Sequence, residues 1–256
     1  MTTFDHADIY GDYRCEEVFG KALKENQGLR DNMQLISKCG IKLISPGRPD
    51  HKVKHYDTSS KHITASVDRS LANLNTEYLD MLLIHRPNPL MDLEDTAKGL
   101  DEVVKAGKVK TIGVSNFTTW QFEQLNAATT APLITNQLEL SVLELKALHD
   151  GTIGQCQSLQ VSPMAWSPLG GGRLFSGADE GVARLQTVLG KIADEFDTTI
   201  DQVALAWILH HPAKILPIVG TNNIDRIRKS EDAERVKISD EQWHEIWEAS
   251  AGREVP

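Results

Sequence analysis

Four side chains in the first third of the sequence could together place a proton on the oxygen of a carbonyl group: Asp5, Tyr10, Lys38 and His85. A phenol is a weak acid, and an ammonium held beside it stabilises the phenolate, so that the pair can act as a general acid near neutral pH. A histidine close by can donate a hydrogen bond to the same oxygen as charge develops on it. This chemistry suits carbonyl reduction, provided that a hydride is delivered.

Lys38 is the most informative of these residues, because it follows the apolar run Leu35-Ile36 and Ser37. A lysine at the end of such a run is expected to be desolvated, and a buried ammonium is costly unless it is paired. Asp5 is its expected partner. Taken singly, each residue also has a structural interpretation: Asp5 as a helix cap, Lys38 as a charge at a strand end and His85 as a hydrogen-bonding residue before a turn. That interpretation weakens if all of them lie at one edge of a sheet.

Strands and helices alternate along the whole sequence, which is typical of a parallel sheet. Strands are expected to end at residue 4 and to span residues 33–38, 79–84, 109–114, 133–138, 161–166 and 215–219. Helices are expected at residues 14–26, 62–74, 92–106, 119–128, 182–196 and 200–211, within 143–159, and from residues 224 and 239 onwards. Residues 40–57 show no periodicity, and Pro46, Gly47 and Pro49 predict an irregular loop there.

The pattern favours a closed (β/α)8 barrel over an open doubly wound sheet, because no G-x-G-x-x-G motif follows an early strand. About seven parallel strands are expected, so the first strand and helix of such a barrel are apparently lacking. The notable polar residues each follow a strand, and in a barrel all strand carboxyl ends converge on one rim. That shared position is what connects the four candidate residues.

Length, composition and net charge limit which kinds of protein this chain can be. A chain of 256 residues with 40% hydrophobic and 25% charged residues is expected to form a single globular domain over residues 1–256. The net charge of -9 argues against nucleic-acid and membrane partners, since both need a basic surface. Three scattered cysteines predict no disulfide framework, and His51 and His55 lack a third ligand, so no metal is expected. We expect a cytoplasmic protein.

Several short motifs occur in a consistent order along the chain: Phe4-Asp5-x-Ala7-x-x-Tyr10-Gly11, Ser37-Lys38, Leu83-Ile84-His85-Arg86-Pro87, Gly113-Val114-Ser115-Asn116-Phe117, Asn136-Gln137-x-Glu139, Trp166-Ser167-Pro168-Leu169-Gly170-Gly171-Gly172 and Pro217-Ile218-Val219-Gly220-Thr221. In these motifs the sequence resembles the aldo-keto reductases, in the branch of small bacterial-type NADP-dependent oxidoreductases. The resemblance extends over essentially the whole chain. It implies a barrel that binds its cofactor without a dinucleotide fingerprint.

The resemblance also implies a role for each matching position. Tyr10 would be the proton donor, Lys38 would strengthen it as an acid, Asp5 would hold Lys38, and His85 would orient the carbonyl. The implied NADP(H)-binding residues are grouped by the part of the cofactor that they meet. They are Ser115, Asn116 and Gln137 for the carboxamide, Trp166 for stacking on the nicotinamide, Ser167, Leu169, Gly170, Gly171 and Arg173 for the pyrophosphate, and Gly220, Thr221, Asn222 and Arg226 for the adenosine end.

Two departures from the family pattern leave alternatives open. Gly220 precedes Thr221 where NADP-preferring relatives often have a lysine, so Arg226 or Lys229 would have to supply the charge, and NAD(H) is the less favoured alternative. The sequence before Asp5 is shorter than in the family, which leaves a truncated, weakly active member as one alternative function. A cofactor-binding regulatory protein resembling a channel subunit is another. The expected partner is a small carbonyl substrate, and the expected state is a monomer or a homodimer.

Overall fold

The computed structural model describes residues 1–26, 28–177 and 179–254. The chain divides into two compact units, Met1–Asn136 and Gln137–Pro256. The main sheet has the strand order β1-β2-β5-β6-β7-β8-β9, and β7 (Leu133–Glu139) contains the boundary between the units. Among the described residues this is a seven-stranded sheet, as the sequence predicts. The expectation of one domain over the whole chain stays a prediction.

The first unit is built on parallel strands that follow one another in the sheet: β1 (Thr3–Asp5), β2 (Gln34–Cys39), β5 (Leu79–Ile84) and β6 (Val109–Ser115). Asp5 is in register with Ile36, and Lys38 with Leu83. The apolar residues of β5 include Leu82, Leu83 and Ile84, which are buried, as expected of a central parallel strand covered on both faces. These strands end at the residues that carry the candidate chemistry.

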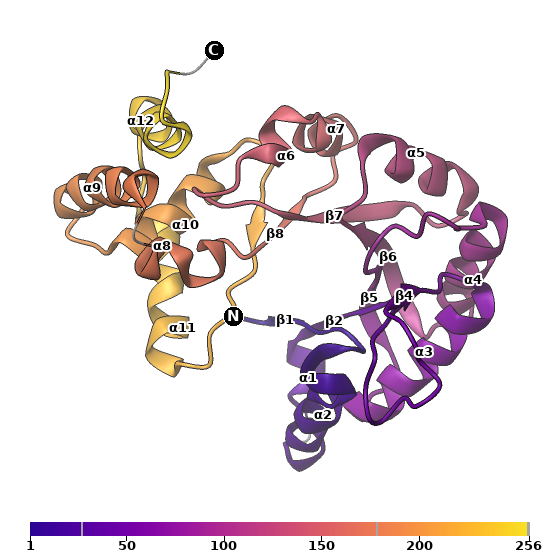
Figure 1. Ribbon diagram of the computed structural model, residues 1–256. Coiled ribbons are helices and arrows are strands. Elements are labelled where there is room, and N and C mark those ends of the chain that lie inside the picture. The colour runs from indigo at the N-terminus through magenta and orange to yellow at the C-terminus, as the bar shows by residue number, and fades with distance from the viewer. Residues whose placement is uncertain (27, 178, 255–256) are drawn as a thin grey trace. The chain divides into compact units, whose positions relative to one another are not determined.

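Helices connect these strands: α1 (Tyr10–Tyr13), α2 (Cys15–Glu25), α3 (Ser60–Leu74), α4 (Leu93–Lys105) and α5 (Thr119–Ala128), with the short 3₁₀ turn η1 (Arg30–Asn32). In Figure 1, α3, α4 and α5 lie on one side of the strands, each beside the next. Local capping explains their starts, because Ser59, Asp92 and Thr118 each accept a hydrogen bond from a backbone N–H of the first turn.

The segment 40–57 is more ordered than the sequence predicts. It contains a short antiparallel pair, β3 (Ile41–Lys42) and β4 (His55–Tyr56), in which Ile41 pairs with Tyr56. Pro46, Gly47 and Pro49 lie in the turn between these strands, where the sequence predicts irregular structure. The strands themselves were missed, because a strand of two residues is too short to show a periodic pattern. The expectation of an irregular loop throughout was therefore wrong at its two ends.

The second unit contains the end of β7 together with β8 (Met164–Trp166) and β9 (Leu216–Pro217). Both strands are shorter than predicted. For β8 the reason is Pro163, which precedes the strand directly and has no N–H to donate. The helical stretch predicted within 143–159 is two helices, separated at Gly151, whose φ of 86° does not continue a helix. The helices of this unit are α6 (Lys146–His149), α7 (Thr152–Ser158), α8 (Arg173–Ser176), α9 (Glu180–Glu195), α10 (Ile200–His210), α11 (Ile224–Glu231) and α12 (Asp240–Ala251), with 3₁₀ turns η2 (Gly170–Gly172) and η3 (Asp232–Arg235).

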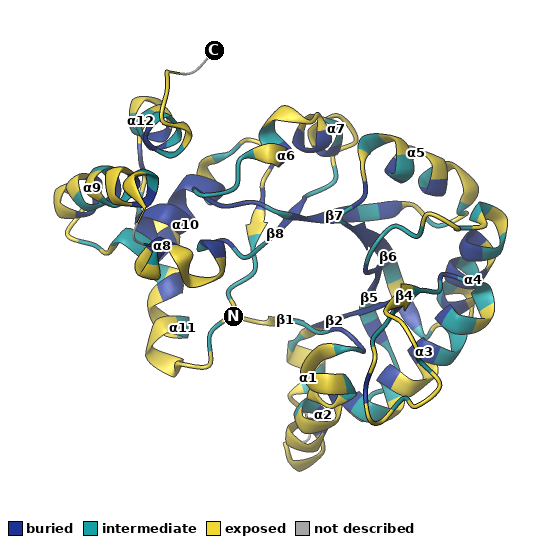
Figure 2. Ribbon diagram, in the orientation of Figure 1, coloured by how far each residue is buried: buried dark blue, intermediate teal, exposed yellow. Residues whose placement is uncertain are grey.

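The core of the second unit lies between α9, α10 and α12, and α10 is almost wholly buried (Figure 2). Trp207 and Trp243 stack with ring centroids 4.9 Å apart, and each indole N–H donates to the backbone carbonyl of the other residue. This reciprocal pair satisfies two buried donors while burying two large rings. Trp243 and Ile246, both on α12, are therefore packing residues of this core.

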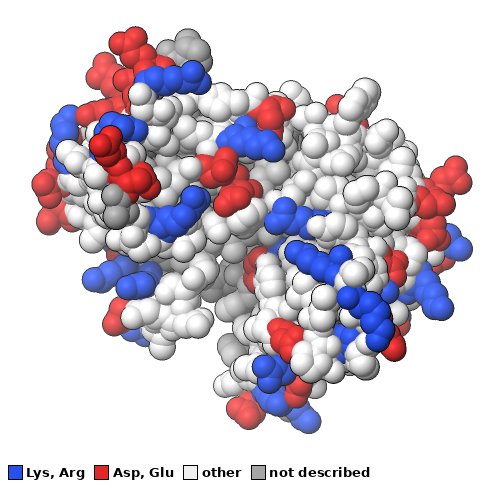
Figure 3. Space-filling view, in the orientation of Figure 1, with Lys and Arg blue, Asp and Glu red and all other residues white. Residues whose placement is uncertain are grey.

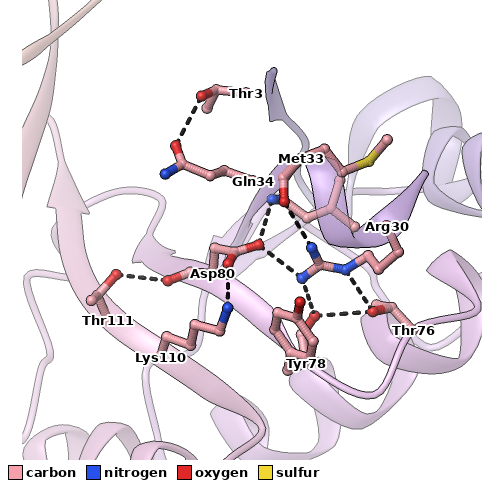
Figure 4. A network of polar contacts seen from close by, with 10 residues as sticks. Thr3, Arg30, Met33, Gln34, Thr76, Tyr78, Asp80, Lys110 and Thr111 are labelled. Atoms are coloured by element: carbon pink, nitrogen blue, oxygen red, sulfur yellow. Dashed lines mark hydrogen bonds and ion pairs between the residues drawn. The ribbon is translucent and has the colours of Figure 1, made fainter. Parts of the chain in front are cut away.

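An ionic network fixes the amino-terminal ends of the strands in the first unit (Figure 4). Arg30 donates to the side chain of Asp80 at 2.8 Å and to the carbonyl oxygens of Met33 and Tyr78, both at 2.9 Å. Asp80 also accepts from the Leu35 N–H at 2.9 Å and from Lys110 at 2.9 Å. Burial alone would raise the pKa of Asp80, but these hydrogen bonds hold it below its ordinary value.

We predict that Asp80→Asn lowers the free energy of unfolding by about 2 kcal/mol at neutral pH, because a charged acceptor of three donors is lost. The control Asp68→Asn breaks an exposed pair with Lys108 and should cost less than about 1 kcal/mol. Because the folded-state pKa of Asp80 is depressed, its contribution is present above about pH 4 and is lost as the pH falls further. Urea unfolding at several pH values measures the free energy of unfolding of both variants. Equal losses for Asp80→Asn and Asp68→Asn would contradict the stabilising role of the Asp80 network.

Candidate active site

The ammonium of Lys38 is the centre of a polar cluster at the carboxyl ends of β1 and β2. The Lys38 side chain is 0% exposed. Its Nζ donates to Asp5 Oδ2 at 2.6 Å, to the carbonyl oxygen of His6 at 2.9 Å and to the phenol oxygen of Tyr10 at 3.1 Å. An ammonium has three donors, so these acceptors satisfy it fully. Sequence reasoning paired Lys38 with Asp5 and Tyr10 but missed the His6 carbonyl, since no side-chain pattern indicates a backbone acceptor.

Backbone hydrogen bonds beyond the strands hold the residues of this cluster in place. The N–H of His6 donates to the backbone carbonyl of Ile36 at 2.8 Å, and the N–H of Asp8 donates to the backbone carbonyl of Lys38 at 3.0 Å. On the other side of β2, the N–H of His85 donates to the carbonyl of Cys39 at 2.9 Å. The residues after β1 and β5 are therefore both attached to the end of β2.

Tyr10 is presented by a left-handed turn. Gly11, Asp12 and Tyr13 have φ values of 57°, 58° and 65°, a conformation that is unfavourable for residues with a Cβ atom. The Tyr10 carbonyl accepts from the Arg14 N–H at 3.2 Å, and the Tyr13 hydroxyl accepts from the Leu43 N–H at 2.8 Å. These bonds close the turn, which leaves Tyr10 37% exposed although its hydroxyl contacts a buried lysine.

His85 stands with its ring edge-on to Tyr10, 5.8 Å between ring centroids. It is 9% exposed, and its Nδ1 has no hydrogen-bond partner among the described residues. Burial, with smaller effects from Lys38, Arg86 and Lys54, lowers the pKa of His85 to about 3. The imidazole is therefore neutral at physiological pH, and one of its nitrogens carries a hydrogen that it can donate.

The loop after β6 holds the two candidate carboxamide-binding residues of the first unit. Asn116 has a φ of 62°, and its side-chain amide donates to Ser115 Oγ at 2.7 Å. Buried Asn136 accepts from the Phe117 N–H at 3.3 Å and donates to the Phe117 carbonyl at 2.8 Å. Asn136 thus fixes the backbone next to Asn116. Its position in a family motif was visible in the sequence, but its function as a loop support was not.

The second unit carries the other candidate cofactor-binding residues after its own strands. Gln137 is buried on β7, and Trp166 ends β8. Positive φ values at Ser167, Gly170, Gly171 and Gly172 make the chain after Trp166 turn tightly. A Cβ atom on Gly171 or Gly172 would meet nothing within 4 Å, whereas one on Gly170 would lie 2.7 Å from Leu143. Two backbone positions of this turn are thus open on one side.

Arg173 and Arg226 are the charged candidates of the second unit. Arg173 Nε donates to the Gly170 carbonyl at 3.1 Å, which holds the guanidinium against the glycine turn. The N–H of Arg226 donates to Asn223 Oδ1 at 3.0 Å at the start of α11, and the N–H of Asn223 donates to Thr221 Oγ1 at 3.2 Å. Gly220, Thr221 and Asn222 therefore lead directly into a capped helix amino terminus, which favours anions.

Other classes of site receive no support from the described ranges. Within them, no group of three or more His, Cys, Asp or Glu side chains is arranged to hold a metal ion. The helices found there all lack the combination of length and apolarity that a membrane crossing needs. Among the described residues, Cys15, Cys39 and Cys156 form no disulfide.

The profile described as "Aldo/keto reductase family" matches residues 1–251. The chain belongs to the aldo/keto reductase family. It is 47% identical over 255 residues to a 6-dehydroglucose reductase of Agrobacterium fabrum (strain C58 / ATCC 33970), an alignment that covers 100% of this chain and 85% of the relative. The family membership predicted from the sequence is confirmed, and with it an NAD(P)H-dependent oxidoreductase that acts on a small molecule.

Solved structures of aldo-keto reductases share the fold. A thermostable aldo-keto reductase, Tm1743, in complex with the inhibitor epalrestat has a TM-score of 0.82 and 28% identity over 96% of this chain and 81% of that one. An aldo/keto reductase from Klebsiella pneumoniae in complex with NADP and acetate has a TM-score of 0.76 and 26% identity over 96% and 79% of the two chains. The predicted (β/α) barrel class is confirmed by these likenesses.

Because the pKa of His85 is lowered in the folded protein, the free energy of unfolding is expected to depend on pH. Below pH 6.5 the unfolded histidine binds a proton that the folded one does not, so stability falls with pH until about pH 3. We expect His85→Gln to reduce the loss of unfolding free energy between pH 6 and pH 4 by about 1 kcal/mol per pH unit. Urea unfolding at several pH values tests this; an unchanged slope would mean that His85 is protonated in the folded protein.

Gly11 should be intolerant of a side chain, because a Cβ atom would lie 2.5 Å from Cys15 Sγ at a φ of 57°. Gly107→Ala is a matched control, since Gly107 has a φ of 71° but nothing within 4 Å of its added Cβ. We predict a loss of about 1 kcal/mol for the control, from the backbone alone, and a distinctly larger loss for Gly11→Ala. Equal losses in thermal or urea unfolding would show that the turn around Gly11 relaxes freely.

Proposed function

We propose that the protein transfers a hydride from NADPH to the carbonyl carbon of small aldehydes or ketones, with Tyr10 as the general acid. The observation that carries this proposal is the hydrogen-bond direction at Lys38. All three donors of the ammonium are used, and the one at 3.1 Å is received by the phenol oxygen of Tyr10. The phenol hydrogen must therefore point away from Lys38, and it is free for a substrate oxygen.

Lys38 would stabilise the phenolate that remains after the proton leaves. Its charge is kept in place by Asp5 at 2.6 Å, which also offsets the cost of burying it. Neutral His85 would donate its ring N–H to the same carbonyl oxygen, which orients the substrate and stabilises negative charge as it develops. A protonated imidazole would compete with Tyr10 as the acid, and the lowered pKa of His85 argues against that competition.

The nicotinamide cofactor supplies the hydride when it is bound. Ser115 and Asn116 of the first unit, and Gln137 of the second, are proposed to bind its carboxamide, and Trp166 is proposed to stack on the ring. For the phosphates, the proposed residues are Ser167, Leu169, Gly170, Gly171 and Arg173, and for the adenosine end Gly220, Thr221, Asn222 and Arg226. The open backbone of Gly171 and the position of Arg173 beside the same turn support the phosphate assignment.

NADP(H) is proposed over NAD(H). The Klebsiella pneumoniae relative was solved with NADP, and Arg226 and Lys229 lie exposed in the helix that follows Thr221. Either cation could meet a 2'-phosphate, which only NADP(H) carries. The adenosine end has no lysine before Thr221, so Arg226→Gln should raise the KM for NADPH more than the KM for NADH.

6-Dehydroglucose is the first substrate to test, because a relative with 47% identity carries the name 6-dehydroglucose reductase. It is a small carbonyl compound with several hydroxyl groups, and it falls within the proposed class. A cytoplasmic location and a monomeric or homodimeric state stay predictions from the sequence.

Tyr10→Phe should lower kcat for NADPH oxidation by at least about a hundredfold, the usual contribution of a general acid. The affinity for NADPH, measured by quenching of its fluorescence, should stay nearly unchanged. Tyr78→Phe is the control. Tyr78 directly precedes β5 and His85 directly follows it, so Tyr78 lies at the end of the strand opposite to the candidate site. It should retain wild-type turnover.

The assay uses 6-dehydroglucose and an activated aldehyde such as 4-nitrobenzaldehyde. If the protein turns over only the activated aldehyde, the proposed reduction is supported and 6-dehydroglucose is excluded as a substrate. Full activity of Tyr10→Phe would show that another group donates the proton. Binding of NADPH by the wild-type protein without oxidation by either substrate would contradict the proposed reaction and favour a regulatory function for cofactor binding.

A further inference from the structure

A polar cavity lies within the first unit, apart from the proposed active site. None of the four proposed catalytic residues lines it. Its volume is about 140 Å³, which is several times the roughly 30 Å³ that one water molecule occupies in the liquid. The turn after β1 contributes Asp8 and Tyr13, the β3–β4 segment contributes Lys42, Arg48 and His51, and α3 contributes His62 and Arg69. We refer to it as the Asp8 cavity.

Two guanidinium groups line the Asp8 cavity without a carboxylate partner among the described residues. Arg48 lies over the ring of Tyr13, 4.8 Å from its centroid. Arg69 donates one hydrogen bond, to Ser66 Oγ at 2.8 Å. A guanidinium has five N–H donors, so most of the donors of these two residues have no acceptor within the described ranges. Lys42, in contrast, is neutralised by Asp57 at 2.8 Å.

The segment of residues 40–57, which lines part of the cavity, carries an excess of cations: Lys42, Arg48, Lys52 and Lys54 against Asp50 and Asp57. Figure 3 shows Lys and Arg side chains gathered over the segment that carries β3 and β4, on a protein whose net charge is -9. A local excess of cations on an acidic protein attracts anions to one place, because the potential near a concave surface depends on the charges that line it.

Asp8 is a buried carboxyl group in the lining of the cavity. It is 8% exposed, and its Oδ1 has no hydrogen-bond partner among the described residues. Burial, together with the charge of Glu16, raises the pKa of Asp8 to about 7, against the opposing effect of Arg69 and Arg48. An unpartnered polar atom in a cavity is unusual in a folded protein and indicates a missing hydrogen-bond partner. In its protonated form the carboxyl would donate a hydrogen bond to an anion.

Among the remaining polar groups, Tyr13 adds a neutral donor. Its hydroxyl accepts from the Leu43 N–H at 2.8 Å, so its own hydrogen is available to a ligand. His51 Nδ1 lies 2.8 Å from the Leu43 carbonyl, so the hydrogen on that nitrogen is used within the protein. Burial lowers the pKa of His62 to about 4, so this imidazole adds no charge near neutral pH. The cavity thus offers the Tyr13 hydroxyl and the guanidinium donors of Arg48 and Arg69, whose charges Asp8 opposes when it is ionised.

We propose that the Asp8 cavity binds a small tetrahedral oxyanion of the phosphate or sulfate type, either free or as the terminal group of a phosphomonoester. Two arginines at one cavity match the oxygens of such an anion, and the protonated Asp8 would supply a further donor to it. A cation would be repelled by Arg48 and Arg69, and an apolar ligand would leave their donors unsatisfied. This inference does not depend on the proposed reductase chemistry.

Sodium sulfate, inorganic phosphate and glucose 6-phosphate serve as probes in isothermal titration at pH 6, with sodium chloride at matched ionic strength as the reference. We expect saturable binding at one site per chain. Arg48→Gln and Arg69→Gln should each raise Kd about tenfold, whereas Arg235→Gln, which alters an exposed arginine of the second unit, should leave it unchanged. Tighter binding of glucose 6-phosphate than of phosphate would identify a phosphomonoester site, and the reverse order would identify a site for the free anion.

Asp8→Asn separates a binding role of Asp8 from a structural one. Sulfate keeps its charge between pH 6 and pH 8, so the wild-type protein should bind it more weakly at pH 8, where Asp8 is ionised. Asp8→Asn should bind sulfate more tightly than the wild type at pH 8, and the two proteins should differ little at pH 6. Thermal unfolding verifies that each variant folds. Non-saturable titration, or wild-type affinity in both Arg48→Gln and Arg69→Gln, would overturn the proposal.

Discussion

The buried ammonium of Lys38 is the constraint on which the first unit depends. A lysine with no exposed surface costs several kcal/mol unless its charge and all its donors are satisfied. The chain meets that requirement with one carboxylate, one backbone carbonyl and one phenol, from Asp5, His6 and Tyr10. Asp5 ends β1, His6 and Tyr10 follow it, and Lys38 belongs to β2. The pairing of the two strands and the geometry of the turn after β1 are therefore determined together. The same contacts that stabilise the charge fix the position of the Tyr10 phenol oxygen.

Unfavourable backbone conformations occur at the ends of strands, next to the candidate residues. Gly11, Asp12 and Tyr13 are left-handed after Tyr10, Asn116 after β6 and Ser167 after Trp166. Such residues cost energy locally and persist only where the surrounding contacts determine them. Here the supports are visible: the Leu43 N–H binds Tyr13, and Asn136 binds both polar groups of the Phe117 backbone. A rigid sheet with strained loops at its end is a common arrangement for positioning reactive side chains.

Asp5 and Asp8 are three positions apart in the sequence, yet their surroundings give them different chemistry. Asp5 pairs with Lys38 at 2.6 Å, and this pair belongs to the cluster that we propose for proton transfer. Asp8 faces a cavity with an unpartnered oxygen, and burial raises its pKa to about 7. The turn that carries Tyr10 therefore separates two sites. One satisfies all three donors of a cation, and the other leaves the donors of two arginines available.

The sequence by itself determined the elements whose signals are local. The apolar run Leu79–Ile84 is β5, and Thr119–Ala128 is α5, with the predicted boundaries, because an apolar run or a capping residue acts within a few positions. It also placed Asp5, Lys38 and His85 at strand ends, and its motifs identified the family. Only the tertiary structure decided the pairing of β3 with β4, the His6 carbonyl as an acceptor for Lys38 and the Asp8 cavity. Each of these features joins residues more than ten positions apart. Periodicity and spacing report only on near neighbours in the chain, so they do not show which distant charges and hydrogen-bonding groups must pair when the protein folds.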